Sequence, residues 1–231
     1  MSVDRLSVFF PAYNEEQNIA LTVEQALKVL KTLGLKNYEV IIVDDGSRDD
    51  TGKIADELAV EYPEVKVVHQ KNRGYGGALK TGFENSKYEW VAFADSDGQF
   101  DFTDITKFLN EADRGDLIVG YRIKRADSTL RKITTFGWKT IARILMGLNV
   151  RDYSCGFKLI KKEVYEAVLP LVGEEKVTQI EMLVKAKRLG FKFVEVGVPH
   201  YPRKFGIQTG ANLKVVLKSI SDLFKLWWKI R

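Results

Sequence analysis

The stretch that decides the fold of this chain is Trp90-Val91-Ala92-Phe93-Ala94-Asp95-Ser96-Asp97-Gly98-Gln99. Its first half is short and apolar, which is typical of a strand buried on both faces of a parallel sheet. Its second half carries two carboxylates, two positions apart, and then a glycine, directly after the predicted strand. Ligands of open α/β sheets bind at this carboxyl end of the strands.

Asp95 and Asp97 lie where the chain is too irregular to continue the strand, so both carboxylates can converge on one hard divalent cation. Mg²⁺ is usually held by one or two carboxylates together with substrate phosphates, rather than by a full protein cage. The stretch therefore predicts a metal clamp for a diphosphate. The alternative is a simple polar turn, because Asp, Ser and Gly all favour turns.

Strand-like and helix-like patterns alternate on the amino-terminal side of this stretch. The first helical pattern begins with Asn14 as its predicted N-cap and Gln17 three residues later. Such alternation predicts an α/β fold with a doubly wound, mainly parallel sheet and right-handed crossovers. Its polar strand ends, at residues 11–13, 44–47 and 95–99, are expected along one edge. The predicted strands are residues 6–12, 38–43, 65–69 and 90–94, and the predicted helices are residues 14–33, 51–62 and 72–83.

The pattern is less regular after Asp97. Apolar residues recur at helical spacing in residues 213–230, with lysines on the opposite face. We therefore expect a catalytic domain over residues 1–210 and a basic amphipathic helix over residues 211–231. The other predicted helices are residues 103–112, 129–148 and 178–189, and the other predicted strands are residues 117–121, 156–160 and 191–198.

The charge is distributed unevenly along the 231 residues. The net charge is +5, yet residues 122–143 and residues 200–231 each carry seven Lys or Arg against one acid. Both basic segments are also amphipathic and aromatic, which favours an anionic membrane surface or a phosphorylated lipid over nucleic acid. One cysteine, Cys155, excludes an internal disulfide and fits a reducing compartment. We expect a cytoplasmic protein, bound peripherally to the cytoplasmic face of a membrane, without a signal peptide or a spanning helix.

Other catalytic chemistries find little support in the sequence. No cluster of His and Cys indicates a zinc site. The Ser154-Cys155-Gly156 stretch lacks the spacing of a nucleophile elbow. Asp44 and Asp45 have two readings, because they can cap the next helix or accept hydrogen bonds from a base or ribose.

Three motifs together resemble the family 2 glycosyltransferases, which have a GT-A-type fold. They are Pro11-Ala12-Tyr13-Asn14-Glu15, Val43-Asp44-Asp45-Gly46-Ser47 and Asp95-Ser96-Asp97-Gly98-Gln99. Three later stretches are similar to the dolichyl- or polyprenyl-phosphate mannose and glucose synthases within that family, and the likeness covers roughly residues 3–210. These stretches are Val119-Gly120-Tyr121-Arg122, Asp152-Tyr153-Ser154-Cys155-Gly156-Phe157-Lys158 and residues 198–206.

The resemblance implies a role for each matching position. It implies a metal site, for Mg²⁺ or Mn²⁺, at Asp95 and Asp97, and an acceptor-phosphate site at Arg131 and Arg203. The implied catalytic residues are Asp97, Gln99, Arg122 and Arg203. The implied nucleotide-sugar-binding residues are Pro11, Tyr13, Glu15, Val43, Asp44, Asp45, Asp95, Ser96, Asp97, Gln99 and Arg122. The chain departs from the subgroup at residues 206–210, where the usual Gly-x-Ser-Lys pattern and its lysine are missing.

The implied reaction is inverting transfer of a hexose, from a donor such as GDP-mannose or UDP-glucose, to a polyprenyl phosphate. A cation and arginines neutralise the leaving diphosphate. A phosphate acceptor needs no general base, because its second pKa is about 6. Glu181 would suit a sugar-hydroxyl acceptor as a base, although a surface helix carboxylate is the interpretation we favour. An inactive nucleotide-sugar-binding module that docks on membranes is the other alternative.

Overall fold

The computed structural model describes residues 3–123, 140, 143, 147–173, 177–203, 205 and 213–230, with only the side chains of residues 221–229 in the last segment. Within this part of the chain, seven strands form one sheet in the order β3-β2-β1-β4-β6-β5-β7. The strands are β1 (Arg5–Ala12), β2 (Asn37–Asp44), β3 (Val65–His69), β4 (Trp90–Phe93), β5 (Leu117–Arg122), β6 (Lys158–Lys161) and β7 (Phe193–Val198). The helices are α1 (Ile19–Thr32), α2 (Thr51–Glu61), α3 (Gly74–Asn85), α4 (Ile105–Leu109), α6 (Lys162–Ala167), α7 (Val177–Arg188) and α8 (Leu213–Ile230), and a 3₁₀ turn covers Phe102–Asp104.

The sheet is mainly parallel, as predicted. Strand β1 pairs in parallel with β2 and β4, β2 with β3, and β5 with β7. Only β6 runs the other way, antiparallel to both β4 and β5. The carboxyl ends of the other six strands therefore share one edge, which confirms the expected alignment of the polar strand ends.

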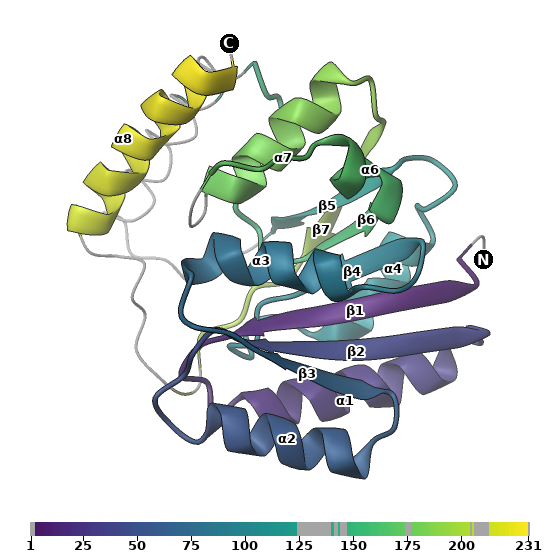
Figure 1. The fold of residues 1–231 in the computed structure, drawn as a ribbon. Coiled ribbons are helices and arrows are strands. Elements are labelled where there is room, and N and C mark those ends of the chain that lie inside the picture. The colour runs from purple at the N-terminus through teal and green to yellow at the C-terminus, as the bar shows by residue number, and fades with distance from the viewer. Residues whose placement is uncertain are drawn as a thin grey trace.

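Helices cover both faces of the sheet, and strand β1 shows why (Figure 1). Val8 and Phe10 belong to the apolar cluster that also contains residues of α1 and α2. Phe9, between them, points to the other face and packs with Phe83 of α3 and Phe93 of β4, at ring-centroid distances of 5.1 and 5.3 Å. A strand apolar on both sides must be covered on both sides, so the continuous hydrophobic runs predict this arrangement correctly.

The direction in which the strands are added reverses between β1 and β4. The chain passes from β1 outward to β2 and β3, and α3 then returns it to β4 on the other side of β1. Ligands of open α/β sheets bind at the carboxyl ends of the strands at such a switch point. Here the loops leaving β1 and β4 both lead to helices on one face of the sheet, since α1 and α4 belong to the same apolar cluster. Those loops are residues 11–18 after β1 and residues 94–101 after β4.

The predicted start of the first helix is wrong by four residues. Helix α1 begins at Ile19, with Asn18 rather than Asn14 at the N-cap position. Asn14 has a positive φ of 56° and cannot begin the helix. Its side-chain oxygen accepts the backbone N–H of Arg48 at 2.8 Å, and its own N–H donates to Ser47 Oγ at 3.0 Å. Asn14, predicted as the helix cap, therefore connects the loop after β1 to the loop after β2.

The remaining elements lie close to their predicted positions. The helix expected at residues 103–112 is divided into the 3₁₀ turn and the short α4, and α6 was not predicted. The helix expected at residues 129–148 falls almost wholly outside the described residues. Among those residues, no helix is long and apolar enough to cross a membrane.

Helix α8 lies alongside α7 (Figure 1). Leu223 and Leu226 are buried in the apolar cluster that α7 helps to build, and Trp227 packs partly against it. Phe224 and Trp228 lie on the surface, with exposed fractions of 48% and 73%. In its described part, α8 therefore packs one apolar face against the protein and exposes two aromatic side chains to solvent.

Leu226→Ala is expected to lower the free energy of unfolding by about 2–5 kcal/mol, because it opens a cavity under α8. Phe224→Ala, two positions away, is the matched control and should change it by about 0.5 kcal/mol or less. Urea unfolding of both variants makes the comparison. Equal stability of the two would contradict the packing of α8 against α7.

Candidate active site

The loops after β1 and β4 are joined at the switch point. The hydroxyl of Ser96 donates to the backbone carbonyl of Pro11 at 2.8 Å, and the bond is buried. Ser96 thus fixes the loop that carries Asp95 and Asp97 against the end of β1. Pro11 and Val43 lie opposite each other in the parallel register of β1 and β2. These three predicted site residues are buried, so they shape the edge of the sheet more than they present side chains to a ligand.

Asp95 and Asp97 are brought together as predicted, in a partly buried position. Burial, together with the negative charge of Asp95, raises the pKa of Asp97 to about 7. Asp97 Oδ1 accepts the backbone N–H of Gln99 at 3.1 Å, which fixes its orientation. Two carboxylates that disfavour each other's charge in a buried site suit a divalent cation.

The donor set also fits the kind of cation that the sequence predicts. Within the described residues, no group of three or more His, Cys, Asp or Glu side chains forms a complete metal cage. A pair of carboxylates is what Mg²⁺ uses when phosphate oxygens supply other ligands. The site is therefore suited to a cation that arrives with, or is completed by, a diphosphate.

Asp95 is held from two sides by residues far away in the sequence. The hydroxyl of Tyr75, at the start of α3, donates to Asp95 Oδ1 at 2.8 Å. On the other side Gly156 makes a close approach, since a Cβ added there would lie 2.0 Å from Asp95 Oδ2. Tyr75 is a site residue that the sequence reasoning missed.

Gln99 connects the switch point to the segment that follows β7. Its side-chain amide donates to the Tyr201 carbonyl at 2.9 Å, and its own carbonyl accepts the Tyr201 N–H at 2.9 Å. This pairing brings Arg203 to the site, where the guanidinium donates to a carboxylate oxygen of Glu15 and to the Phe205 carbonyl. Three predicted residues, Gln99, Glu15 and Arg203, thus lie together with Asp97.

Arg122 has protein partners of its own. Its guanidinium donates Nε–H to Asp152 Oδ2 at 2.7 Å and Nη2–H to Asp152 Oδ1 at 3.0 Å. Nη2 also donates to Ser154 Oγ at 3.2 Å. This two-pronged pair lies at the end of β5, with only about a tenth of the Arg122 side chain exposed. The sequence reasoning quoted Asp152 and Ser154 only as part of a motif and missed that they orient this arginine.

The end of β2 and the loop after it carry two of the predicted nucleoside-binding residues, Asp44 and Asp45. Asp45 Oδ1 accepts the Gln70 side-chain amide at 2.5 Å and the Arg73 N–H at 2.8 Å. Asp44 accepts the Ser47 N–H at 3.0 Å and lies 2.9 Å from His69 Nδ1. Both carboxylates therefore order the edge of β2, while Tyr13, 41% exposed, is free of the sheet and faces solvent.

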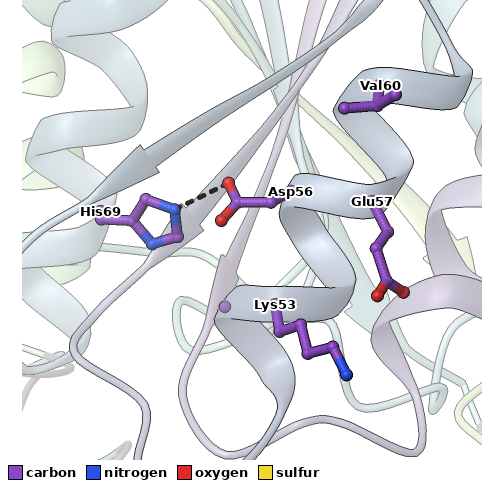
Figure 2. Close-up of a pocket in the computed structure, with 6 residues that line it drawn as sticks. Lys53, Asp56, Glu57, Val60 and His69 are labelled. Carbon is purple, nitrogen blue, oxygen red and sulfur yellow. Dashed lines mark hydrogen bonds and ion pairs between the residues drawn. The ribbon is translucent and has the colours of Figure 1, made fainter.

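A surface hollow of about 660 Å³ opens on the outer side of this edge (Figure 2). His69 bridges Asp44 and Asp56 there, with its Nε2 3.0 Å from Asp56 Oδ1. The lining combines two acids of α2 with one lysine, so it offers little to a diphosphate. The hollow is lined by Gly52, Lys53, Asp56, Glu57, Val60 and His69.

Glu181 is neither at the surface nor available as a base. It is fully buried in α7, and its oxygens accept the backbone N–H groups of Val172 at 3.1 Å and Gly173 at 2.6 Å. Lys185 pairs with it at 2.7 Å. The interpretation as a surface carboxylate is wrong, because this side chain ties α7 to the preceding loop. Arg131 and residues 206–210 lie outside the described residues.

Comparisons with known proteins agree with this geometry. The model of the family "Glycosyl transferase family 2" matches residues 7–169. Glycosyltransferase AglD of Haloferax volcanii is 30% identical, over 97% of this chain and 37% of its own length. Dolichyl-phosphate beta-glucosyltransferase of Dictyostelium discoideum is 31% identical, over 84% of this chain and 65% of its own length. The chain thus spans less than two thirds of both relatives.

A solved structure shares the fold. It is glucosyl-3-phosphoglycerate synthase from Mycobacterium tuberculosis in complex with Mn²⁺, uridine diphosphate and glucosyl-3-phosphoglycerate. It superposes with a TM-score of 0.73 at 20% identity, covering 98% of this chain and 81% of its own. The GT-A-type fold inferred from the sequence is confirmed. Together with the family model, which matches well over half of the chain, these likenesses show that the chain belongs to glycosyl transferase family 2.

Proposed function

We propose that this chain transfers a hexose from a nucleoside diphosphate sugar to a polyprenyl phosphate, with inversion at the anomeric carbon. The observation that carries the proposal is the pair Asp95 and Asp97 at the switch point, beside Arg203. The donor's diphosphate needs positive charge exactly where its leaving-group charge develops. The relative from Dictyostelium discoideum, named as a dolichyl-phosphate glucosyltransferase, supports the choice of acceptor.

Asp95 and Asp97 would hold Mg²⁺ or Mn²⁺, which supplies Lewis-acid stabilisation of the diphosphate when bound. Asp44, Asp45 and Tyr13 line the edge where the nucleoside would lie. The arginines are preformed: Arg203 is aimed at the site by Glu15, and Arg122 by Asp152. The protein partners use Nε and Nη2 of each guanidinium, so a phosphate oxygen would be met by the N–H groups of Nη1.

The buried position of Glu181 favours a phosphate acceptor over a sugar hydroxyl. A hydroxyl nucleophile needs a general base within hydrogen-bond reach. The oxygens of Glu181 are already used by two backbone N–H groups and Lys185. A phosphomonoester is mostly a dianion near neutral pH, since its second pKa is about 6, and it attacks without losing a proton.

The surface of α8 gives the protein a means of reaching a lipid acceptor. Phe224 and Trp228 face solvent one helical turn apart, and Lys225 and Lys229 are exposed beside them. Aromatic side chains suit the interface of a bilayer, and each lysine adds about 1 kcal/mol of attraction near an anionic surface. We therefore propose peripheral association with the cytoplasmic face of a membrane.

The direct test of the function is a panel of nucleotide sugars incubated with polyprenyl phosphate or with the corresponding polyprenol. With Mn²⁺ or Mg²⁺ present, one donor should give a glycolipid from the phosphate alone. Asp97→Asn should abolish the product, because an amide is a poorer ligand for a hard cation. It should leave the thermal midpoint unchanged or raised, since it removes repulsion between two carboxylates.

Asp113→Asn, at an exposed position, is the matched control and should transfer like the wild type. Transfer to polyprenol would favour the hydroxyl-acceptor alternative. Binding of a nucleotide sugar with no transfer to any acceptor would favour the docking module. Full activity of Asp97→Asn at low metal concentration would remove the metal role from that residue.

The double variant Phe224→Ser, Trp228→Ser should bind anionic vesicles at least about tenfold more weakly, because inserting one large apolar side chain is worth about 1.5–3 kcal/mol. Val60→Ser replaces an apolar side chain that is 89% exposed on α2 and should bind like the wild type. Vesicle co-sedimentation at low and high salt measures both, and salt should weaken the wild type through screening. Unchanged binding of the double variant would refute a membrane role for this face.

A further inference from the structure

Lys158 is a fully buried lysine in an apolar strand. It lies on β6, between Phe157 and Leu159, with no exposed surface. Its ammonium donates to the backbone carbonyl of Cys155 and to Oε1 of Gln179, and it lies 5.5 Å from the centroid of the Phe93 ring. Among the described residues, no carboxylate forms an ion pair with it. Such a charge is costly to bury, which calls for an explanation.

A chain of hydrogen bonds leads from this ammonium to the metal site. Gln179 of α7, 2% exposed, receives Lys158 on its oxygen and donates its Nε2–H to the Tyr75 hydroxyl oxygen at 3.0 Å. Tyr75 in turn donates its hydroxyl proton to Asp95 Oδ1 at 2.8 Å. The chain therefore joins β6, α7 and α3 to the loop after β4.

The lysine sets the direction of every bond in this chain. An ammonium has donors and no acceptor, so Gln179 must turn its oxygen toward Lys158 and its NH₂ toward Tyr75. The Tyr75 oxygen then accepts, and its single proton is directed to Asp95. Without the ammonium, the amide of Gln179 could flip and accept the hydrogen bond of the Tyr75 hydroxyl on its own oxygen. The Asp95 oxygen would then lose its hydrogen bond from Tyr75.

We propose that Lys158 and Gln179 are positioning residues which, through Tyr75, hold the Asp95 carboxylate in the orientation that receives the cation and the donor diphosphate. The proposal rests on the donor site described above. Gly156 completes the arrangement from the opposite side, since its missing side chain leaves room for Asp95 Oδ2. Hydrogen bonds to the carboxylates of a metal site commonly decide its affinity in this way.

Two physical arguments favour positioning over a purely structural role. Burying an ammonium that has no carboxylate partner costs stability, so the charge itself does not strengthen the fold. Burial lowers the pKa of Lys158 to about 8, which leaves the ammonium charged at neutral pH. The Lys158 ammonium thus stays charged although its burial costs stability, and its charge orders the hydrogen bonds that lead to Asp95.

The test measures Mn²⁺ affinity, from the electron paramagnetic resonance of free Mn²⁺, with uridine or guanosine diphosphate present. Lys158→Met and Gln179→Glu should each bind Mn²⁺ about 10–100-fold more weakly. Gln179→Glu is the sharper variant, because a carboxylate can pair with Lys158 but cannot donate to Tyr75. It should keep or raise the thermal midpoint while binding weakens, a combination that a structural role does not predict.

Lys161→Met is the matched control. Lys161 lies on the same strand, over the Trp90 ring at 5.6 Å, and pairs with Asp116 at 2.8 Å. It lies opposite Trp90, at the end of the β4–β6 pairing away from Asp95. Its loss should leave Mn²⁺ affinity unchanged. If Lys158→Met fails to fold, Tyr75→Phe, which removes only the hydroxyl, must show the same weakening.

Wild-type Mn²⁺ affinity in folded Gln179→Glu and Tyr75→Phe would overturn the inference. The measurement needs neither sugar nor acceptor, so a wrong acceptor in the proposed function would not alter its outcome. Absence of Mn²⁺-dependent nucleotide binding in the wild type would instead remove the donor site, and this inference with it.

Discussion

The repulsion between Asp95 and Asp97 is the constraint on which the rest of the site depends. Two carboxylates in a partly buried loop do not remain close unless the surrounding chain holds them there. Ser96 ties their loop to β1, and Tyr75 and Gly156 hold Asp95 from either side. The repulsion between the two carboxylates lowers the stability of the fold, and a bound cation would relieve it.

The two arginines of the site are each held by a carboxylate. Arg203 and Arg122 are mostly buried, and each is paired with a carboxylate, Glu15 and Asp152 respectively. Pairing avoids an isolated buried charge and fixes the plane of each guanidinium. A phosphate entering the site would find cations already oriented, and Glu15 would be the group that it competes with for Arg203. Gln99 makes this possible, because its two bonds to Tyr201 bring the segment after β7 across the switch point.

The sequence predicted the parts of this structure that depend on local patterns. Strands apolar on both faces, such as Trp90–Phe93, require cover on both sides, and carboxylates after them must gather at one edge. Contacts between distant segments carry no such local signal. Asn14 looks like a helix cap in the sequence, yet it bridges to Arg48, and Glu181 looks like an exposed helical acid, yet it is buried. Lys158 is unusual in the sequence because it lies within an apolar strand. The local pattern does not predict its contact with Gln179, which lies on α7.

The central claim is that the loop after β4 holds a divalent cation on a nucleoside diphosphate. A crystal structure of the chain grown with Mn²⁺ and uridine or guanosine diphosphate, with the metal located by anomalous scattering, tests it most directly. The account predicts a peak within bonding distance of a carboxylate oxygen of Asp95 or Asp97, bridged to the diphosphate. A metal bound elsewhere, for instance at His69 with Asp44 and Asp56, and none at Asp95 and Asp97, would contradict it.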